Sequence, residues 1–302
     1  MIETIPAALD GERVDRVISL ITGCSRTQAV ALVDAGAVRV DGDVVTQRSR
    51  RLRVGEQIDV PDVDLAPPLP KSDPAVAYTL VYEDEQVLVI DKPAGVVVHP
   101  GAGNLDGTLV NGLLARFPEL ASVGDPLRPG IVHRLDKGTS GLLVVARTPL
   151  AYDDLVGQLA AHEAHRGYRA LAWGEFDTPR GVIDAPIGRS DRDPTKMVVS
   201  QKGRAARTHY EVDQTFHEPV IVSLLTCVLE TGRTHQIRVH LAAIGHPVVG
   251  DDRYRGTRPG LHVGRPWLHA CTLRFAHPES GEELSFSSPL PEDLVAVLDT
   301  LR

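Results

Sequence analysis

Five prolines lie between Val60 and Pro74, and this cluster constrains the fold more than any other feature of the 302-residue chain. Proline fixes its own φ angle, lacks a backbone N–H and restricts the residue before it, so this segment can form neither a helix nor a central strand. It predicts a semi-rigid linker over residues 63–75. The linker divides the chain into a small first domain, residues 1–62, and a larger second domain, residues 76–302.

The first domain is predicted to contain two short helices followed by a strand pair. The apolar spacing favours an amphipathic helix over residues 13–21. Ser25, with Gln28 three residues later, is typical of a capping box that begins a second helix, which Gly36 ends. Valines on both sides of Asp41-Gly42-Asp43 predict two strands around a tight turn.

A basic run follows these elements. Two helices, a hairpin and a trailing basic segment resemble the S4 type of RNA-binding module over roughly residues 10–60. The alternative is a generic small α+β appendage. The resemblance implies that the basic run contacts RNA through Arg48, Arg50 and Arg51.

A charged loop lies between two apolar runs of the second domain. The loop, His133 to Gly141, follows Gly130-Ile131-Val132 and precedes Leu142 to Ala146, so two buried strands are predicted to flank it. Its acid, Asp136, has cations close on both sides. The loop lacks the Gly or Asn pair of a tight hairpin and carries more charge than a connector requires, which favours a functional role.

This loop resembles the signature of the RluA-type pseudouridine synthases, which isomerise uridine to pseudouridine in RNA. The family's catalytic aspartate corresponds to Asp136. A family arginine that enters the RNA where the target nucleotide leaves corresponds to Arg134. Extruding a base costs a few kcal/mol, and a planar cation can fill the gap by stacking and by contacting phosphate. Lys137 and Arg233 are also predicted to contact RNA.

Three further segments resemble motifs of the same family. Residues 91–100, followed by residues 107–111, resemble the first motif, to which we assign a scaffolding role beneath the charged loop. Residues 165–170 resemble the second motif, whose tyrosine stacks on the target base and is a candidate acid or base; it corresponds to Tyr168. Arg166 stands where many relatives carry lysine, and Gly138 where many carry an acid.

The third motif corresponds to residues 231–240 and ends in an arginine that pairs with the catalytic aspartate; this arginine corresponds to Arg238. An attacking carboxylate must remain ionised in a partly desolvated pocket, and a neighbouring guanidinium favours its charged form. Ile237 and Val239 alternate with Arg238 and His240. The alternation predicts a strand with Arg238 and His240 on one face.

The second domain is predicted to have an α+β fold. β-branched runs at 79–82, 87–90 and 142–145 favour buried strands, and apolar spacing favours helices at 109–117, 155–162 and 292–301. The resemblance implies a mixed, largely antiparallel sheet, preceded by the small α+β RNA-binding domain.

Composition limits the other possibilities. Three cysteines, far apart and odd in number, predict neither a disulfide framework nor structural zinc. No apolar run predicts a membrane span, so a soluble cytoplasmic protein is expected. The net charge of -8 argues against an RNA partner, but local clusters of arginine decide such binding. Isomerisation needs no redox partner or transferred group, so no cofactor is expected. The histidine clusters, His162 with His165 and His235 with His240 and His246, match no zincin or two-helix carboxylate site, so no metal is expected.

The resemblance implies action on structured RNA, and the two-domain arrangement resembles the RluD-like branch that modifies large-subunit ribosomal RNA. A retaining glycoside hydrolase also directs a carboxylate at an anomeric carbon, but it needs a second carboxylic acid that none of the motifs supplies. A non-catalytic RNA-binding or ribosome-assembly factor on a synthase scaffold is the other alternative. The target uridine, single-site or multi-site action, the route of covalent attack and the oligomeric state stay open, with a monomer favoured.

Overall fold

The computed structural model describes residues 1–24, 26–61, 69–101, 104–193 and 195–302. The chain divides into two compact units, Met1–Leu69 and Pro70–Arg302, and the division falls within the proline-rich segment. Residues 62–68, which include the first six residues of the predicted linker, lie outside the described residues, as does Ser25, the predicted start of the second helix. None of the described helices combines the length and the apolarity needed to cross a bilayer.

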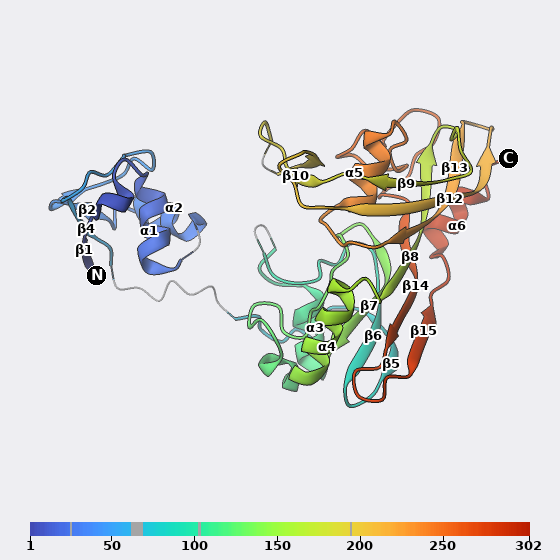
Figure 1. Ribbon diagram of the computed structural model, residues 1–302, viewed down its shortest axis with the longest axis horizontal. Coiled ribbons are helices and arrows are strands. Elements are labelled where there is room, and N and C mark those ends of the chain that lie inside the picture. The colour runs from blue at the N-terminus through green and yellow to red at the C-terminus, as the bar shows by residue number, and fades with distance from the viewer. Residues whose placement is uncertain (25, 62–68, 102–103, 194) are drawn as a thin grey trace. The chain divides into compact units, whose positions relative to one another are not determined.

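The first unit packs two helices on a small antiparallel sheet with the strand order β1-β4-β2-β3 (Figure 1). Val14, Val17 and Ile18 have the i, i+3, i+4 spacing of one helix face, and all three are fully buried. Gly23 ends this helix in the left-handed conformation, with φ 73°. The elements are β1 (Ile2–Thr4), α1 (Val14–Thr22), α2 (Arg26–Asp34), β2 (Arg39–Val40), β3 (Asp43–Val44) and β4 (Gln57–Asp59).

The second unit is built on a nine-stranded sheet among its described residues, with the order β5-β6-β7-β14-β8-β13-β12-β9 and β15 paired to β14 (Figure 1). The β7–β14 pair is parallel, and the other pairs are antiparallel, so the α+β fold with a mixed, largely antiparallel sheet is confirmed. Its strands are β5 (Thr79–Glu83), β6 (Val87–Lys92), β7 (Ser140–Ala146), β8 (His165–Trp173), β9 (Arg180–Asp184), β12 (Arg207–Phe216), β13 (Val222–Leu229), β14 (Leu268–Ala276) and β15 (Glu283–Ser287).

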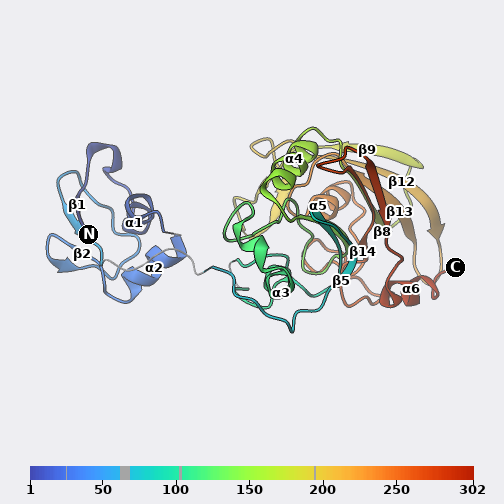
Figure 2. The ribbon, with the colours of Figure 1, turned by 90° about the horizontal axis from the view of Figure 1, so that it is seen from below.

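Helices cover both faces of this sheet. On one face, α3 (Leu109–Arg116) and α5 (Gln236–Ala243) share a core with β6, β7, β8 and β13. On the other face, α4 (Pro149–Ala160) packs on β7 and β14, and α6 (Glu292–Leu298) packs on β8 and β13. Figure 2 shows α5 lying against the inner side of the curved sheet. A separate hairpin, β10 (Ile187–Arg189) with β11 (Met197–Val199), follows β9.

The parallel β7–β14 pair brings the charged loop to the strand of Tyr168. Gly141 is aligned with Ala270 of β14, and Ala270 is aligned with Tyr168 of β8. A Cβ on Gly141 would collide with the backbone carbonyl of Ala270, and the φ angle of Gly141 is 114°. Only glycine therefore permits this close pairing.

Three expectations about local structure were wrong. Gly130-Ile131-Val132 forms no strand; only Ile131 makes a single bridge, to Val145. The helix expected at 155–162 begins earlier, at Pro149, where the Thr148 hydroxyl accepts a hydrogen bond from the Ala151 N–H. Residues 236–243 form α5 rather than a strand, because a four-residue alternation of apolar and polar side chains is too short to separate a strand from a helix.

Candidate active site

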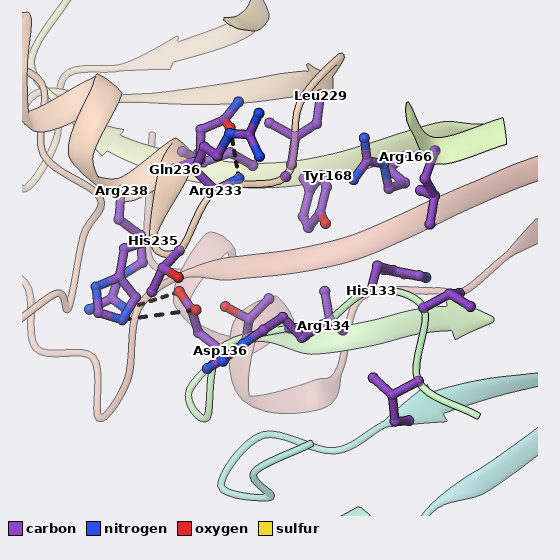
Figure 3. Close-up of a pocket in the computed structure, with 18 of the residues that line it drawn as sticks. His133, Arg134, Asp136, Arg166, Tyr168, Leu229, Arg233, His235, Gln236 and Arg238 are labelled. Atoms are coloured by element: carbon purple, nitrogen blue, oxygen red, sulfur yellow. Dashed lines mark hydrogen bonds and ion pairs between the residues drawn. The ribbon is translucent and has the colours of Figure 1, made fainter. Parts of the chain in front are cut away.

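A cavity of about 460 Å³ opens between the charged loop, β8 and the beginning of α5 (Figure 3). These three segments are far apart in the sequence. In Figure 3, Tyr168 lies between Arg166 and the pair formed by Asp136 and Arg238. The structure thus brings together all three residues that sequence analysis predicted to be catalytic.

Asp136 forms an ion pair with Arg238. The Arg238 Nη1 donates to Asp136 Oδ2 at 3.0 Å, and the Asp136 side chain keeps 16% of its surface exposed. The loop itself is fixed on both sides of the acid: the Thr139 N–H donates to the Asp136 carbonyl, and the Gly95 N–H donates to the Lys137 carbonyl. The carboxylate is therefore held in place, charged and open to the cavity.

Arg238 is in turn held by Asp251, which is completely buried. The Arg238 Nε donates to Asp251 Oδ2 at 2.6 Å and Nη2 donates to Oδ1 at 2.9 Å, a two-point contact that fixes the plane of the guanidinium. Burial works to lower the pKa of Arg238, but the hydrogen bonds and charges of Asp251 and Asp136 outweigh it and raise that pKa. Arg238 stays cationic beside Asp136.

His235 approaches the other oxygen of Asp136. Its Nε2 is 3.9 Å from Oδ1, which is too long for a hydrogen bond, and its Nδ1 is 2.8 Å from the Tyr254 hydroxyl. That hydroxyl already accepts a hydrogen bond from the Met197 N–H of the β10–β11 hairpin, so its own proton is available to Nδ1. In that arrangement the imidazole carries its proton on Nε2 and directs it at Asp136.

The beginning of α5 is fixed by Gln236, which is almost fully buried. Its Nε2 donates to the Arg207 carbonyl and to the Thr208 hydroxyl of β12, while its Oε1 accepts from the Thr231 hydroxyl and the Arg233 N–H. These four hydrogen bonds anchor the first residue of α5 to β12 and to the preceding turn, at the point where the chain enters a helix rather than a strand. One consequence is that His240 does not share a face with Arg238, because its ring contacts Thr208 and the Ala185 carbonyl instead.

Tyr168 extends from β8 into the cavity and is 6% exposed. Burial raises the pKa of its phenol to about 12, although the charge of Arg166 opposes this shift. The phenol is therefore neutral at pH 7, with a hydroxyl that can donate a hydrogen bond and a ring that can stack on a base.

Lys92 lies beneath the charged loop and is completely buried. Its Nζ donates to the carbonyls of Pro93 and Val96 at 2.8 and 2.9 Å. Burial lowers its pKa to about 7, and the nearby charge of Asp136 works against that shift. The first motif thus places a titratable group close to the carboxylate.

The residues predicted to contact RNA are distributed differently. Arg134 is exposed, lines the cavity and donates from Nη1 to His99 Nε2 at 3.3 Å. Arg233 also lines the cavity, with Nε donating to the Ala205 carbonyl. Lys137 is exposed but does not line the cavity.

Arg48, Arg50 and Arg51 belong to the first unit. Arg48 pairs with Asp34 at 2.7 Å, and Arg50 pairs with Glu56 at 3.3 Å. Arg51 donates to the Gly11 carbonyl at 2.6 Å. Arg48 and Arg51 are exposed on this unit, and Arg50 is half-buried.

The cavity is strongly basic although the chain is acidic. Its lining contains one carboxylate, that of Asp136, together with Arg128, Arg134, Arg166, Arg204, Arg233 and Arg238. Among the residues that the structure describes, no three His, Cys, Asp or Glu side chains converge as the ligands of a metal would. The local charge suits a polyanion.

Comparison with known proteins decides the family. The family model of RNA pseudouridylate synthase matches residues 86–243, and that of the S4 domain matches residues 12–58. The chain belongs to the RNA pseudouridylate synthase family. It is therefore an isomerase of uridine in RNA, with an S4 domain at its amino end.

Relatives match over nearly the whole length. The "Uncharacterized RNA pseudouridine synthase YlyB" of Bacillus subtilis is 42% identical over 296 residues, covering 96% of this chain and 94% of that protein. The "Ribosomal large subunit pseudouridine synthase D" of Xanthomonas campestris is 45% identical over 312 residues, covering 99% of this chain and 91% of that protein. The structure of human RNA pseudouridylate synthase domain containing 1 is also similar, with a TM-score of 0.56 and 30% identity, over 72% of this chain and 84% of that one.

Sequence analysis missed Asp251 and Tyr254 and gave Lys92 no role of its own. The buried residues Asp251 and Tyr254 act on the site through Arg238 and His235, which lie on another element. The sequence does contain one signal, the segment Gly250-Asp251-Asp252-Arg253-Tyr254, in which acids, an arginine and a tyrosine directly follow an apolar pair.

Proposed function

We propose that this synthase modifies uridine in large-subunit ribosomal RNA, with Asp136 as its covalent catalyst. The observation that supports this most directly is the single carboxylate of the cavity, held at 3.0 Å by Arg238 and surrounded by arginines. Relatives named for the large ribosomal subunit match 99% of the chain, S4 domain included, and this supports the choice of RNA.

The chemistry conserves every atom of the uridine. Asp136 attacks carbon 6 of the base or carbon 1′ of the ribose, and the N1–C1′ bond breaks. The uracil turns and carbon 5 bonds to carbon 1′, which on the ribose route displaces Asp136 from carbon 1′. Carbon 5 then loses its proton and N1 gains one, and on the base route the bond between Asp136 and carbon 6 breaks by elimination, so that the carboxylate is free again. Arg238 keeps the attacking carboxylate charged and aimed, and Tyr168 stacks on the base and assists the proton transfer.

The target must leave its helix or loop to reach this cavity. Arg134, exposed at the cavity beside His99, is suited to fill the gap left by the flipped base. Arg233 and Lys137 contact phosphates of the RNA that is bound at the second unit. Arg48, Arg50 and Arg51 contact phosphates of the RNA that is bound at the S4 domain.

The experiment is to map pseudouridines chemically, with a carbodiimide, in the ribosomal RNA of cells with and without this protein. We expect one or more large-subunit pseudouridines to disappear in the deletion, to return with the wild type and to stay absent with Asp136→Asn. Ribosome assembly is scored separately. If Asp136→Asn restored assembly while no pseudouridine depended on the protein, the non-catalytic assembly factor would be the correct interpretation.

A further inference from the structure

Arg166 is a buried cation in the cavity that the proposed reaction does not use. It is 6% exposed, and its Nη2 donates to the backbone carbonyl of Glu230 at 3.0 Å. Its Nε is the one buried side-chain nitrogen or oxygen, among the described residues, that has no hydrogen-bond partner. Because nearly all buried polar groups are hydrogen-bonded, such an atom requires an explanation.

No described carboxylate neutralises this guanidinium. The Glu230 side chain is engaged by Arg207 at 3.2 Å and by His209 at 2.6 Å, and Asp136 is engaged by Arg238. Arginine stays charged in proteins, and burying a charge without a counter-charge costs several kcal/mol. Arg166 therefore lowers the stability of the free protein, which suggests that its charge is kept for a ligand.

The surroundings of Arg166 increase its demand for an anion. Arg233 lies close enough that its charge, together with burial, lowers the pKa of Arg166. Arg204 lines the same cavity. His133 is neutral, because burial and the charge of Arg166 lower its pKa to about 3. Like charges brought together in this way repel one another until an anion enters.

The distance between Arg166 and Tyr168 on β8 matches the distance between a base and the phosphate of its own nucleotide. Arg166 and Tyr168 are two residues apart on β8, so their side chains lie on the same face of the strand, and a regular strand separates such Cα atoms by about 6.6 Å. A base stacked on Tyr168 has the phosphates of its own nucleotide at a comparable distance.

We propose that Arg166 forms a phosphate subsite inside the cavity, with Arg233 as its second cation, and that it binds a phosphodiester flanking the flipped uridine. The Nε is covered by protein in the free structure, so binding requires the guanidinium to turn toward the cavity. Once turned, its Nε and an Nη donate to two phosphate oxygens, a two-point contact that lysine cannot make. This subsite rests on the proposed function, because it needs an RNA strand in the cavity. Surface phosphate contacts are exposed to water, whereas this subsite is buried. It therefore binds a phosphate only at one defined place, next to the flipped nucleotide.

The test uses RNA that carries the mapped uridine, with a single neutral methylphosphonate at the linkage 5′ or 3′ of it. Affinities are measured in the Asp136→Asn background, so that no turnover intervenes. We expect one of the two neutral linkages to weaken binding about tenfold. Arg166→Met should weaken binding of unmodified RNA by a similar factor, lower the salt slope by about 0.7–0.9, and be insensitive to the same neutral linkage.

Arg169→Met is the matched control. Arg169 is on the same strand but faces the other way, where it contacts Asp213 and Thr226. This variant should retain the RNA affinity and its sensitivity to the neutral linkage. Arg166→Lys keeps the positive charge but lacks the paired N–H donors of the guanidinium. This variant should fold even if Arg166→Met does not. Its RNA affinity should no longer differ much between the 5′ and the 3′ neutral linkage.

A stability measurement separates a ligand site from a structural role. Arg166→Met should unfold at a temperature no lower than the wild type, because it removes an uncompensated buried charge, whereas a structural arginine would leave a clearly destabilised protein. The proposal would be wrong if the neutral linkage lowered the RNA affinity of the wild type and of Arg166→Met by the same factor. It would also be wrong if Arg166→Met bound unmodified RNA as tightly as the wild type. A third result would be that inorganic phosphate competes with RNA for the wild type but not for Arg166→Met, while the neutral linkages have no effect on affinity. That result would assign the subsite to free phosphate instead. If wild type forms no pseudouridine, the proposed function fails, while the affinity and salt slope of any bound RNA still report on Arg166.

Discussion

Asp251 binds Arg238 along the edge formed by Nε and Nη2, which leaves Nη1 directed at Asp136. The catalytic ion pair is therefore one half of a three-residue chain, carboxylate to guanidinium to carboxylate. Asp251 is completely buried, and its Oδ1 also accepts hydrogen bonds from the backbone N–H groups of Arg253 and Tyr254. Asp251 is a positioning residue that touches no reacting atom.

Asp251→Asn should lower the rate of the chemical step by about 10- to 100-fold with little change in RNA affinity. It also removes one partner of a buried charge pair, so the free energy of unfolding should fall by about 3 kcal/mol. Single-turnover kinetics and chemical denaturation measure the two effects. The neighbouring Asp252, which is exposed, provides the control: Asp252→Asn should change neither quantity. A normal single-turnover rate in Asp251→Asn would show that Arg238 is oriented sufficiently by Asp136 and by the Tyr254 ring, whose centroid is 5.2 Å from the guanidinium carbon.

Tyr254→Phe removes the hydroxyl that links the β10–β11 hairpin to His235. Without it, Nδ1 loses its hydrogen-bond partner, and the imidazole no longer favours the form with the proton on Nε2. We expect the chemical step to slow by about tenfold while the RNA affinity is retained. The tautomer can be read from the ¹⁵N chemical shifts of His235, which should show a protonated Nε2 in the wild type and a mixture in Tyr254→Phe. A wild-type protein with the proton on Nδ1 would contradict this arrangement.

Motif strings and local caps could be predicted from the sequence. Asp136, Tyr168 and Arg238 follow from residue patterns, and Thr108 with Asn111 three residues later forms a local capping box at the beginning of α3. These features depend on residues close together in the chain. Residues 130–132 were expected to form a strand, but only Ile131 pairs with the sheet, through one bridge to Val145. The short apolar run packs against the sheet without adding a strand to it.

Long-range contacts could not be predicted. Asp251 lies 115 residues from Asp136 in the chain and acts on it through Arg238, and Lys92 lies 44 residues away. The local sequence around each residue does not show that it lies near Asp136. The alternation at 237–240 misled because four residues fit a helix and a strand equally well, and the contacts of Gln236 with β12 that anchor this segment are not visible in the local pattern. Side chains that act through tertiary hydrogen bonds need the fold before their role can be recognised.

Tyr168→Phe tests whether the hydroxyl is needed as well as the ring. The phenylalanine keeps the stacking face, so RNA affinity should change by less than about threefold. The chemical step should slow by about 100-fold or more, since general acid or base catalysis contributes that much. Tyr168→Leu should in addition weaken binding by about 1–3 kcal/mol, through loss of stacking. Full activity of Tyr168→Phe would assign the proton transfer to another group.

Wild-type activity should also show no ionisation of Tyr168 near neutral pH. Its pKa of about 12 keeps the phenol protonated up to about pH 11. A pH–rate limb between pH 6 and 10 that disappears in Tyr168→Phe would contradict this.

Lys92 should make stability depend on pH. Burial lowers its pKa to about 7 in the folded protein, and in the unfolded chain the pKa returns to its ordinary value of 10.5. Between these values the unfolded chain binds the proton and the folded protein does not, so the free energy of unfolding rises with pH. Each pH unit contributes about 1.4 kcal/mol at most.

The measurement is urea denaturation between pH 7 and 9. Burial raises the pKa of the Cys227 thiol to about 12, so this group has the opposite effect, but only above pH 9. Lys92→Met should flatten the profile over pH 7–9 and should raise stability most at pH 7. An equally steep profile in Lys92→Met would mean that another group titrates in this window.

The three arginines of the S4 domain should determine part of the salt dependence of RNA binding. Replacing Arg48, Arg50 and Arg51 with glutamine should lower the slope of log affinity against log salt by up to about 2–3, because each phosphate that the protein neutralises contributes close to one unit. The fold should tolerate the change, because exposed ion pairs such as Arg48–Asp34 contribute about 1 kcal/mol or less. The chemical step at saturating RNA should be unaffected. As a control, Arg116→Gln with Arg180→Gln removes two exposed cations that pair with Glu83 and Glu211 in the second unit and should leave the slope unchanged. An unchanged slope in the S4 variant would show that these arginines bind no phosphate, and that the cavity arginines carry the electrostatic part of the binding.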